Sequence, residues 1–258
     1  MNIFEWFTPK RKTWLYDVNP AVKFGVFFTL FIIIFFNSHN WFVFFQMVLA
    51  GLLLYLFSGY DWKKLLLFTL PIVITFVTST ITMILFGRGE NVWWQWGIIK
   101  ISEESFYKGL LLGFKATYFA FMSFVFLLTS RPIIMFYAFM QQFKLPPKYA
   151  YSFIAAFRIV PIVVEEIQTR TNALKVRGMT YSKGFKGIYE RLRLYSIPLF
   201  AQSIRRAQRL AVAMEAKRFQ IAAKRTYFYE TTYTPIDAIF LFVMIILTVI
   251  TYLLTKLV

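Results

Sequence analysis

Cysteine is absent from the 258 residues of this chain, and histidine occurs once, as His39. The lack of cysteine excludes a disulfide framework, a thiolate nucleophile and a zinc–thiolate site. The single histidine leaves almost no room for a histidine metal centre or for general-base chemistry on imidazole. The chain also lacks a G-x-x-x-x-G-K-[ST] phosphate loop. We therefore expect no catalytic residue, no metal site and no cofactor on this chain, and no hydrolysis of ATP by it.

Acidic residues are scarce as well. Asp and Glu number 12 against 29 Lys and Arg, which gives a formal net charge of +17. A basic stripe can bind nucleic acid, but a cytoplasmic excess of cations beside anionic lipid explains the charge more simply. We expect the lipid membrane as a partner and no nucleic acid.

Apolar residues, in contrast, are abundant. The sequence is 59% hydrophobic and 21% aromatic, whereas soluble domains carry roughly 45–50% apolar residues. A bilayer core of about 30 Å requires about 20 helical residues at 1.5 Å each. Five apolar windows approach this length: residues 20–36, 41–58, 64–86, 106–130 and 235–257. The sequence predicts an all-α integral membrane protein with five transmembrane helices.

The cations divide the chain into three parts. Residues 1–130 form an N-terminal arm and four spans, residues 131–234 form a basic domain, and residues 235–258 form the last span. The basic domain holds 18 of the 29 Lys and Arg against five acids. Cytoplasmic segments are enriched in Lys and Arg. We expect a multi-pass protein of the cell membrane, with its N-terminus and its domain 131–234 in the cytoplasm.

Several residues within and between the spans allow two readings. Lys108 and Lys115 lie on one face of the fourth span, where an ionisable side chain is either functional or snorkels to the interface. Three of the residues 93–96 are tryptophan, which indicates an interfacial aromatic belt or a lid over a partner's binding site. Gly109 and Gly113 follow the small-xxx-small spacing that allows close contact between helices.

Prolines and glycines divide the basic domain into predicted helices. The first covers residues 132–142 and the second residues 148–176, with a kink expected at Pro161 and an end at Gly178. After a loop containing Gly184 and Gly187, we expect a helix to residue 195 and another from Pro198 to about residue 224.

The last of these helices has two distinct faces. Apolar residues repeat at intervals of four and three, which predicts a narrow seam for packing on another helix: Phe200, Ile204, Ala207, Ala211 and Met214. The opposite face carries cations, which are either solvated or bound to anionic headgroups: Arg205, Arg206, Arg209, Lys217 and Arg218.

The two long helices end in similar sequences, Val176-Arg177-Gly178 and Ala216-Lys217-Arg218. A cation at a helix C-terminus is favoured by the helix dipole. From there it can reach a carboxylate on a second protein. Two such helix ends could engage two partner subunits.

These segments resemble a known family. The run from Thr129 to Pro132, the stretch 145–178 and the later segment 213–219 are similar to the transmembrane coupling component of energy-coupling factor transporters, the family of the cobalt and biotin permease T subunits. Asp17, Asn19-Pro20 and Lys23 resemble the opening motif of that family. The likeness spans most of the chain, and several motifs agree in order and spacing.

The resemblance implies a mechanism and partners. Such components bind two ABC-type ATPase subunits, or one fused ATPase, through arginine motifs on coupling helices. They also hold a small substrate-binding membrane protein, and ATP resides on the ATPases. The residues carried over are Val176, Arg177 and Gly178 in the first motif, and Ala216, Lys217 and Arg218 in the second, flanked by Glu215 and Phe219. We expect Arg205 and Arg209, from the cationic face of the same helix, to support this coupling helix together with Glu215 and Phe219.

The second motif departs from the family pattern. Lys217 stands where arginine is expected, and Arg218 stands where a small residue is expected. A lysine cannot supply the bidentate guanidinium fork. Lys217 therefore acts as a point charge, or Arg218 has taken over the contact.

Two other functions stay open from the sequence. A membrane scaffold or receptor without transport would share every feature except the coupling. An intramembrane enzyme could use the neighbouring acids Glu165 and Glu166, although Arg158 and Arg170 nearby favour ion pairing. For a transporter, the resemblance favours a vitamin or its precursor over a metal, and the overall likeness suggests the thiamine or hydroxymethylpyrimidine type.

Overall fold

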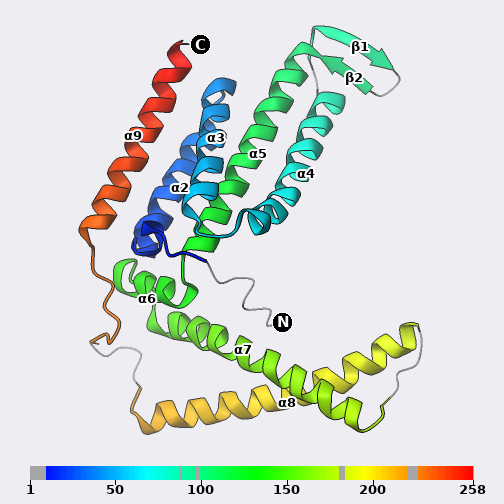
Figure 1. Cartoon of the computed structure of the whole chain (residues 1–258), viewed down its shortest axis with the longest axis vertical. Coiled ribbons are helices and arrows are strands. Elements are labelled where there is room, and N and C mark those ends of the chain that lie inside the picture. The colour runs from blue at the N-terminus through cyan, green and yellow to red at the C-terminus, as the bar shows by residue number, and fades with distance from the viewer. Residues whose placement is uncertain (1–9, 88, 97–98, 180–183, 220–225, 258) are drawn as a thin grey trace. The chain divides into compact units, whose positions relative to one another are not determined.

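The computed structural model describes residues 10–87, 89–96, 99–179, 184–219 and 226–257 (Figure 1). The chain forms two compact units, one made of residues 1–138 and 231–258 and the other of residues 139–230. The predicted boundary between residues 130 and 131 lies just before a helix, and the compact unit begins within that helix. Each unit is described by itself.

The first unit is built from apolar helices at the five predicted spans. They are α2 (Pro20–Phe36), α3 (Asn40–Phe57), α4 (Trp62–Phe86), α5 (Glu103–Thr129) and α9 (Pro235–Leu257), preceded by the short helix η1 (Trp14–Tyr16). The last four are long and apolar enough to cross a membrane, whereas α2, with 17 residues, is shorter. The predicted all-α membrane fold is confirmed.

Helix α5 lies at the centre of this unit and packs against α3 and α4 (Figure 1). The core is formed by fully buried side chains from several spans, among them Ile34, Val43, Leu54, Val125 and Phe240. Many large apolar side chains on the outer surfaces stay exposed, for example on α4 and α9. A hydrocarbon solvent covers such surfaces without cost, so they fit a membrane-embedded unit.

The two glycines of the small-xxx-small pattern lie where α5 meets α4. A Cβ atom at Gly109 would lie 2.7 Å from a side-chain carbon of Ile84, and one at Gly113 would overlap the hydroxyl of Thr80. Both glycines are buried. The close contact that their spacing predicts is therefore present, and it depends on the missing side chains.

A feature that the sequence analysis did not predict is an antiparallel hairpin of β1 (Val92–Trp96) and β2 (Ile99–Ser102) between α4 and α5. It ends in a capping box, in which the Ser102 hydroxyl accepts from the backbone N–H of Ser105 and the Ser105 side chain accepts from the N–H of Ser102. Trp93 and Trp94 are exposed on β1, and the side chain of Trp96 lies outside the described part.

The basic segment contains three helices, α6 (Pro132–Gln142), α7 (Pro147–Val176) and α8 (Phe185–Ala216). The bounds of α6 and α7 agree with the prediction, and Pro161 lies inside α7.

The prediction for α8 was wrong in three respects. The helix is continuous through Pro198, it includes Gly187 in its first turn, and it ends at Ala216 rather than near residue 224. An interior proline removes one backbone hydrogen bond and costs about 3 kcal/mol. Both halves of α8 are held on α7, by Tyr195 before the proline and by Arg206 after it, so the helix is not interrupted.

Candidate functional site

Helices α7 and α8 run in opposite directions and cross one another (Figure 1). Three contacts show the direction, because the residue number in α8 and the segment directly after it falls as the number on α7 rises: Tyr151 with Phe219, Glu166 with Arg206, and Thr171 with Tyr195. The Tyr151 and Phe219 rings meet edge to face with their centroids 5.6 Å apart. The C-terminus of α8 therefore lies at the start of α7.

The end of α7 carries the first predicted motif. Gly178 has a φ of +67°, its N–H donates to the carbonyl of Lys175 at 3.0 Å, and the N–H of Met179 donates to the carbonyl of Leu174 at 3.2 Å. These two bonds define a Schellman motif with Arg177 as the C-cap. Val176 is 89% exposed, and Arg177 is exposed as well.

The end of α8 repeats this geometry residue by residue. The N–H of Arg218 donates to the carbonyl of Glu215 at 2.8 Å, and the N–H of Phe219 donates to the carbonyl of Met214 at 2.9 Å. Lys217 is the C-cap, so it corresponds to Arg177, and Arg218 corresponds to Gly178. We name the two helix ends the first tip (residues 176–178) and the second tip (residues 216–218).

Arg218 adopts a left-handed conformation, with a φ of +51°. For a residue with a Cβ atom this conformation costs roughly 1–2 kcal/mol, whereas glycine adopts it freely. A cation at a helix C-terminus regains about 0.3–1 kcal/mol from the helix dipole, less in salt. The second tip is therefore a strained version of the first.

The cations of both tips are available to a partner. Arg177, Lys217 and Arg218 are exposed, as are Glu215 and Ala216. Within the part of the chain that the structure describes, none of the three cations forms an ion pair. The two predicted supporting residues Arg205 and Arg209 are also exposed on α8.

Two predicted roles change. Arg206, placed by periodicity on the free basic face, instead lies against α7 and pairs with Glu166, whose predicted partners were Arg158 and Arg170. The amide of Gln202, with its nitrogen turned to Glu166, donates to both carboxylate oxygens at 2.9 and 3.0 Å. Glu166 thus joins α7 to α8, and nothing here favours it as one of two catalytic acids.

The antiparallel pairing separates the two tips. The second tip lies beside Tyr151, and Arg177 follows 26 residues later along α7. At 1.5 Å per residue this helix length gives about 39 Å. The tips therefore lie at opposite ends of the α7–α8 pair.

The apolar seam of α8 is uncovered by the described chain. Phe200 is 68% exposed and Ile204 is 59% exposed. These side chains lie opposite the face that contacts α7. The predicted packing of this seam on another helix is therefore not made within the described residues.

Sequence analysis named Asn19 and Lys23 as motif residues but did not predict that they belong to a buried polar cluster in the first unit. Lys23 is fully buried and donates from its Nζ to the carbonyl of Thr129 at 3.0 Å, and Asp237, 4% exposed, accepts from the N–H of Asn19 at 2.7 Å. Thr129 and Asp237 flank the segment 131–234 on either side. The sequence signal for this cluster was a lysine near the start of an apolar window, because ionisable residues in such windows are rare and mostly have a specific partner.

Lys115 has a specific partner. Its ammonium donates to the carbonyl of Phe35 at 2.9 Å, in the last turn of α2. Carbonyls of the last turn lack helical partners, so Lys115 caps α2. Lys108 is exposed.

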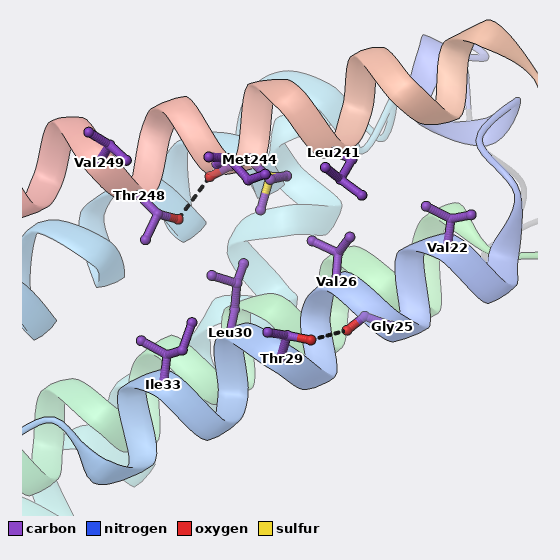
Figure 2. Close-up of a pocket in the computed structure, with 11 residues that line it drawn as sticks. Val22, Gly25, Val26, Thr29, Leu30, Ile33, Leu241, Met244, Thr248 and Val249 are labelled. Carbon is purple, nitrogen blue, oxygen red and sulfur yellow. Dashed lines mark hydrogen bonds between the residues drawn. The ribbon is translucent and has the colours of Figure 1, made fainter.

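A groove of 610 Å³ runs between α2 and α9 (Figure 2). Among its lining residues the hydroxyls of Thr29 and Thr248 are bonded to the carbonyls of Gly25 and Met244 in their own helices. The groove therefore offers a hydrocarbon surface and no free donor to a polar substrate. Among the described residues no cluster of three His, Asp or Glu could hold a metal ion.

Comparison with known proteins identifies relatives over most of the chain. The CbiQ family, described as cobalt transport protein, matches residues 11–228. A protein of Lactococcus lactis is 28% identical over 235 residues, 88% of each chain, and one of Lacticaseibacillus paracasei is 27% identical over 246 residues, 92% of each. A protein of Listeria monocytogenes is 28% identical over 225 residues, which cover 83% of this chain and 84% of the relative. All three are named energy-coupling factor transporter transmembrane proteins.

Proposed function

Since this chain belongs to the CbiQ family of cobalt transport proteins, we propose that it is the transmembrane coupling subunit of an energy-coupling factor transporter and transmits ATP-driven motion to a substrate-capture protein. The names of its relatives support the transporter class. The chain itself is a transport subunit rather than an enzyme, and ATP is hydrolysed on its partners.

The two tips carry this proposal. Each presents an exposed cation beyond the last turn of a long helix, in the same Schellman geometry. A carboxylate-lined groove on an ABC-type ATPase is the matching partner, because ion pairs with arginine give directed, charge-assisted hydrogen bonds. Two ATPase subunits, or one fused ATPase with two lobes, would each take one tip.

The proposed complex also includes the protein that captures the substrate. A small substrate-binding membrane protein would need an apolar surface on this subunit, and the exposed seam around Phe200 and Ile204 supplies one. The basic charge of residues 131–234 supports a cytoplasmic location of the tips and of the N-terminus. A vitamin or its precursor, of the thiamine or hydroxymethylpyrimidine type, stays our prediction for the substrate.

The experiment is charge reversal at the first tip. Arg177→Glu should abolish co-purification of the ATPase subunits and substrate uptake, while the chain still inserts in the membrane at the normal level. Arg158→Glu is the matched control, because Arg158 is an exposed arginine in the middle of α7 and forms no ion pair among the described residues. Normal uptake in Arg177→Glu would favour a scaffold or receptor over a coupling subunit.

A further inference from the structure

Arg218 holds a backbone conformation that a glycine would hold more easily. The equivalent position of the first tip is Gly178, and the hydrogen bonds around the two residues are the same. A glycine at position 218 would therefore complete the same helix end without strain. The strain at the second tip needs a reason outside the fold of the tip itself.

The surroundings of Arg218 supply no such reason. Its side chain is exposed and has no ion-pair partner within the described ranges. The neighbouring Phe219 makes the packing contact with Tyr151. The helix dipole regains less than the conformation costs, and the preceding Lys217 already places a cation at this helix end.

We propose that Arg218 makes the arginine contact of the second tip, and that its guanidinium binds a carboxylate of the partner ATPase through two parallel hydrogen bonds. This inference rests on the docking function proposed above. Lys217 lacks a planar guanidinium, so its ammonium adds only a point charge and cannot form the two parallel hydrogen bonds. The strained backbone is retained because it places an arginine one residue beyond the C-cap, where the first tip has only a glycine hydrogen.

The proposal has a consequence for the partners. The first tip presents one cation in the positions 176–178, and the second presents two, Lys217 and Arg218. The groove that receives the second tip should therefore contain a carboxylate placed for the fork and a further acidic group near the lysine. A groove suited to the first tip alone would bind the second less well, so the two tips select different ATPase grooves.

The test separates binding from stability. Purified ATPase subunits of the same transporter are titrated against the detergent-purified chain, and the thermal unfolding of each variant is measured in parallel. Arg218→Gly should bind the ATPase subunits about tenfold or more weakly, because one charge-assisted pair is lost. The same variant should unfold at the same or a higher temperature. Arg218→Lys, which keeps the charge and removes the fork, should recover only part of the binding.

Lys144→Gly is the matched control. Lys144 follows α6 and is the other non-glycine residue with positive φ in the described chain, at +54°. Its replacement should also preserve or raise the unfolding temperature, with binding unchanged. Lys217→Gln, which removes a point charge, should weaken binding about threefold.

Three outcomes would overturn the assignment. If Arg218→Gly binds normally, or if Lys217→Gln shows the larger loss, Arg218 is not the contact. If Arg218→Gly unfolds at a lower temperature and its loss of binding follows that instability, Arg218 has a structural role. In all three cases, a loss of ATPase binding in Arg177→Glu would still support the proposed docking function. Normal ATPase binding in Arg177→Glu would contradict the docking function itself.

Discussion

Replacement of Asp237 should loosen the attachment of the last span to the first. Its buried carboxylate accepts from the N–H of Asn19 at 2.7 Å, and from the N–H and hydroxyl of Thr234 at 2.8 and 3.2 Å. Hydrogen bonds to charged groups contribute about 1.5–3 kcal/mol each, and alanine would leave the N–H of the buried Asn19 without an acceptor. The two short bonds predict that Asp237→Ala lowers the free energy of unfolding by about 3–6 kcal/mol.

The assay is thermal unfolding of the detergent-purified chain, followed by tryptophan fluorescence. Asp61→Ala is the matched control, since Asp61 pairs with Lys10 at 2.9 Å with both side chains exposed, at 44% and 71%. Exposed pairs contribute about 0–1 kcal/mol, so this variant should unfold almost as the parent does. An equally small shift in Asp237→Ala would refute the argument that the buried cluster holds α9 on α2.

Three further outcomes are expected. Gly113→Leu should destabilise the chain by about 1–3 kcal/mol in thermal unfolding, since α4 fills the space beside it, whereas Gly25→Leu, with nothing within 4 Å of its Cβ position, should change little. Burial raises the pKa of the Tyr16 hydroxyl, so its contribution to stability is complete below about pH 10 and is lost as the pH rises through the folded pKa; Tyr16→Phe should show a shallower decline of the unfolding temperature as the pH rises above about 10. Glu166→Gln should weaken the contact of α7 with α8 and speed amide hydrogen exchange in α8, and unchanged exchange would contradict the role of that ion pair.

Local signals were sufficient for most of the helices. The five apolar windows needed only length and hydropathy, because in a membrane each helix satisfies its own backbone hydrogen bonds. The bounds of α6 and α7 followed from a proline in the first turn and from Gly178, whose left-handed conformation ends α7. Where a residue restricts the conformation of its own backbone, its identity alone is enough to predict where a helix begins or ends.

Signals that depend on a partner segment were misread. Pro198 predicts a break when its neighbours are considered alone, but contacts with α7 on both sides keep α8 continuous. Lys23 was noted only as part of a motif in the chain, and it is buried against the end of α5, 106 residues away. Periodicity placed Arg206 on a free face, because it cannot tell which side of a helix a second helix covers.

The amino-acid sequence by itself determined the class of this protein, its family resemblance and the two cationic helix ends, since hydropathy, charge and helix-capping chemistry act over a few residues. Only the tertiary structure decided that α7 and α8 are antiparallel, so that Arg177 and Arg218 lie at opposite ends of the pair. It also decided that Arg218 adopts the left-handed conformation that glycine adopts in the first tip. The physical reason is that these features arise from contacts between segments distant in the chain, and from a backbone angle that no local propensity would assign to arginine.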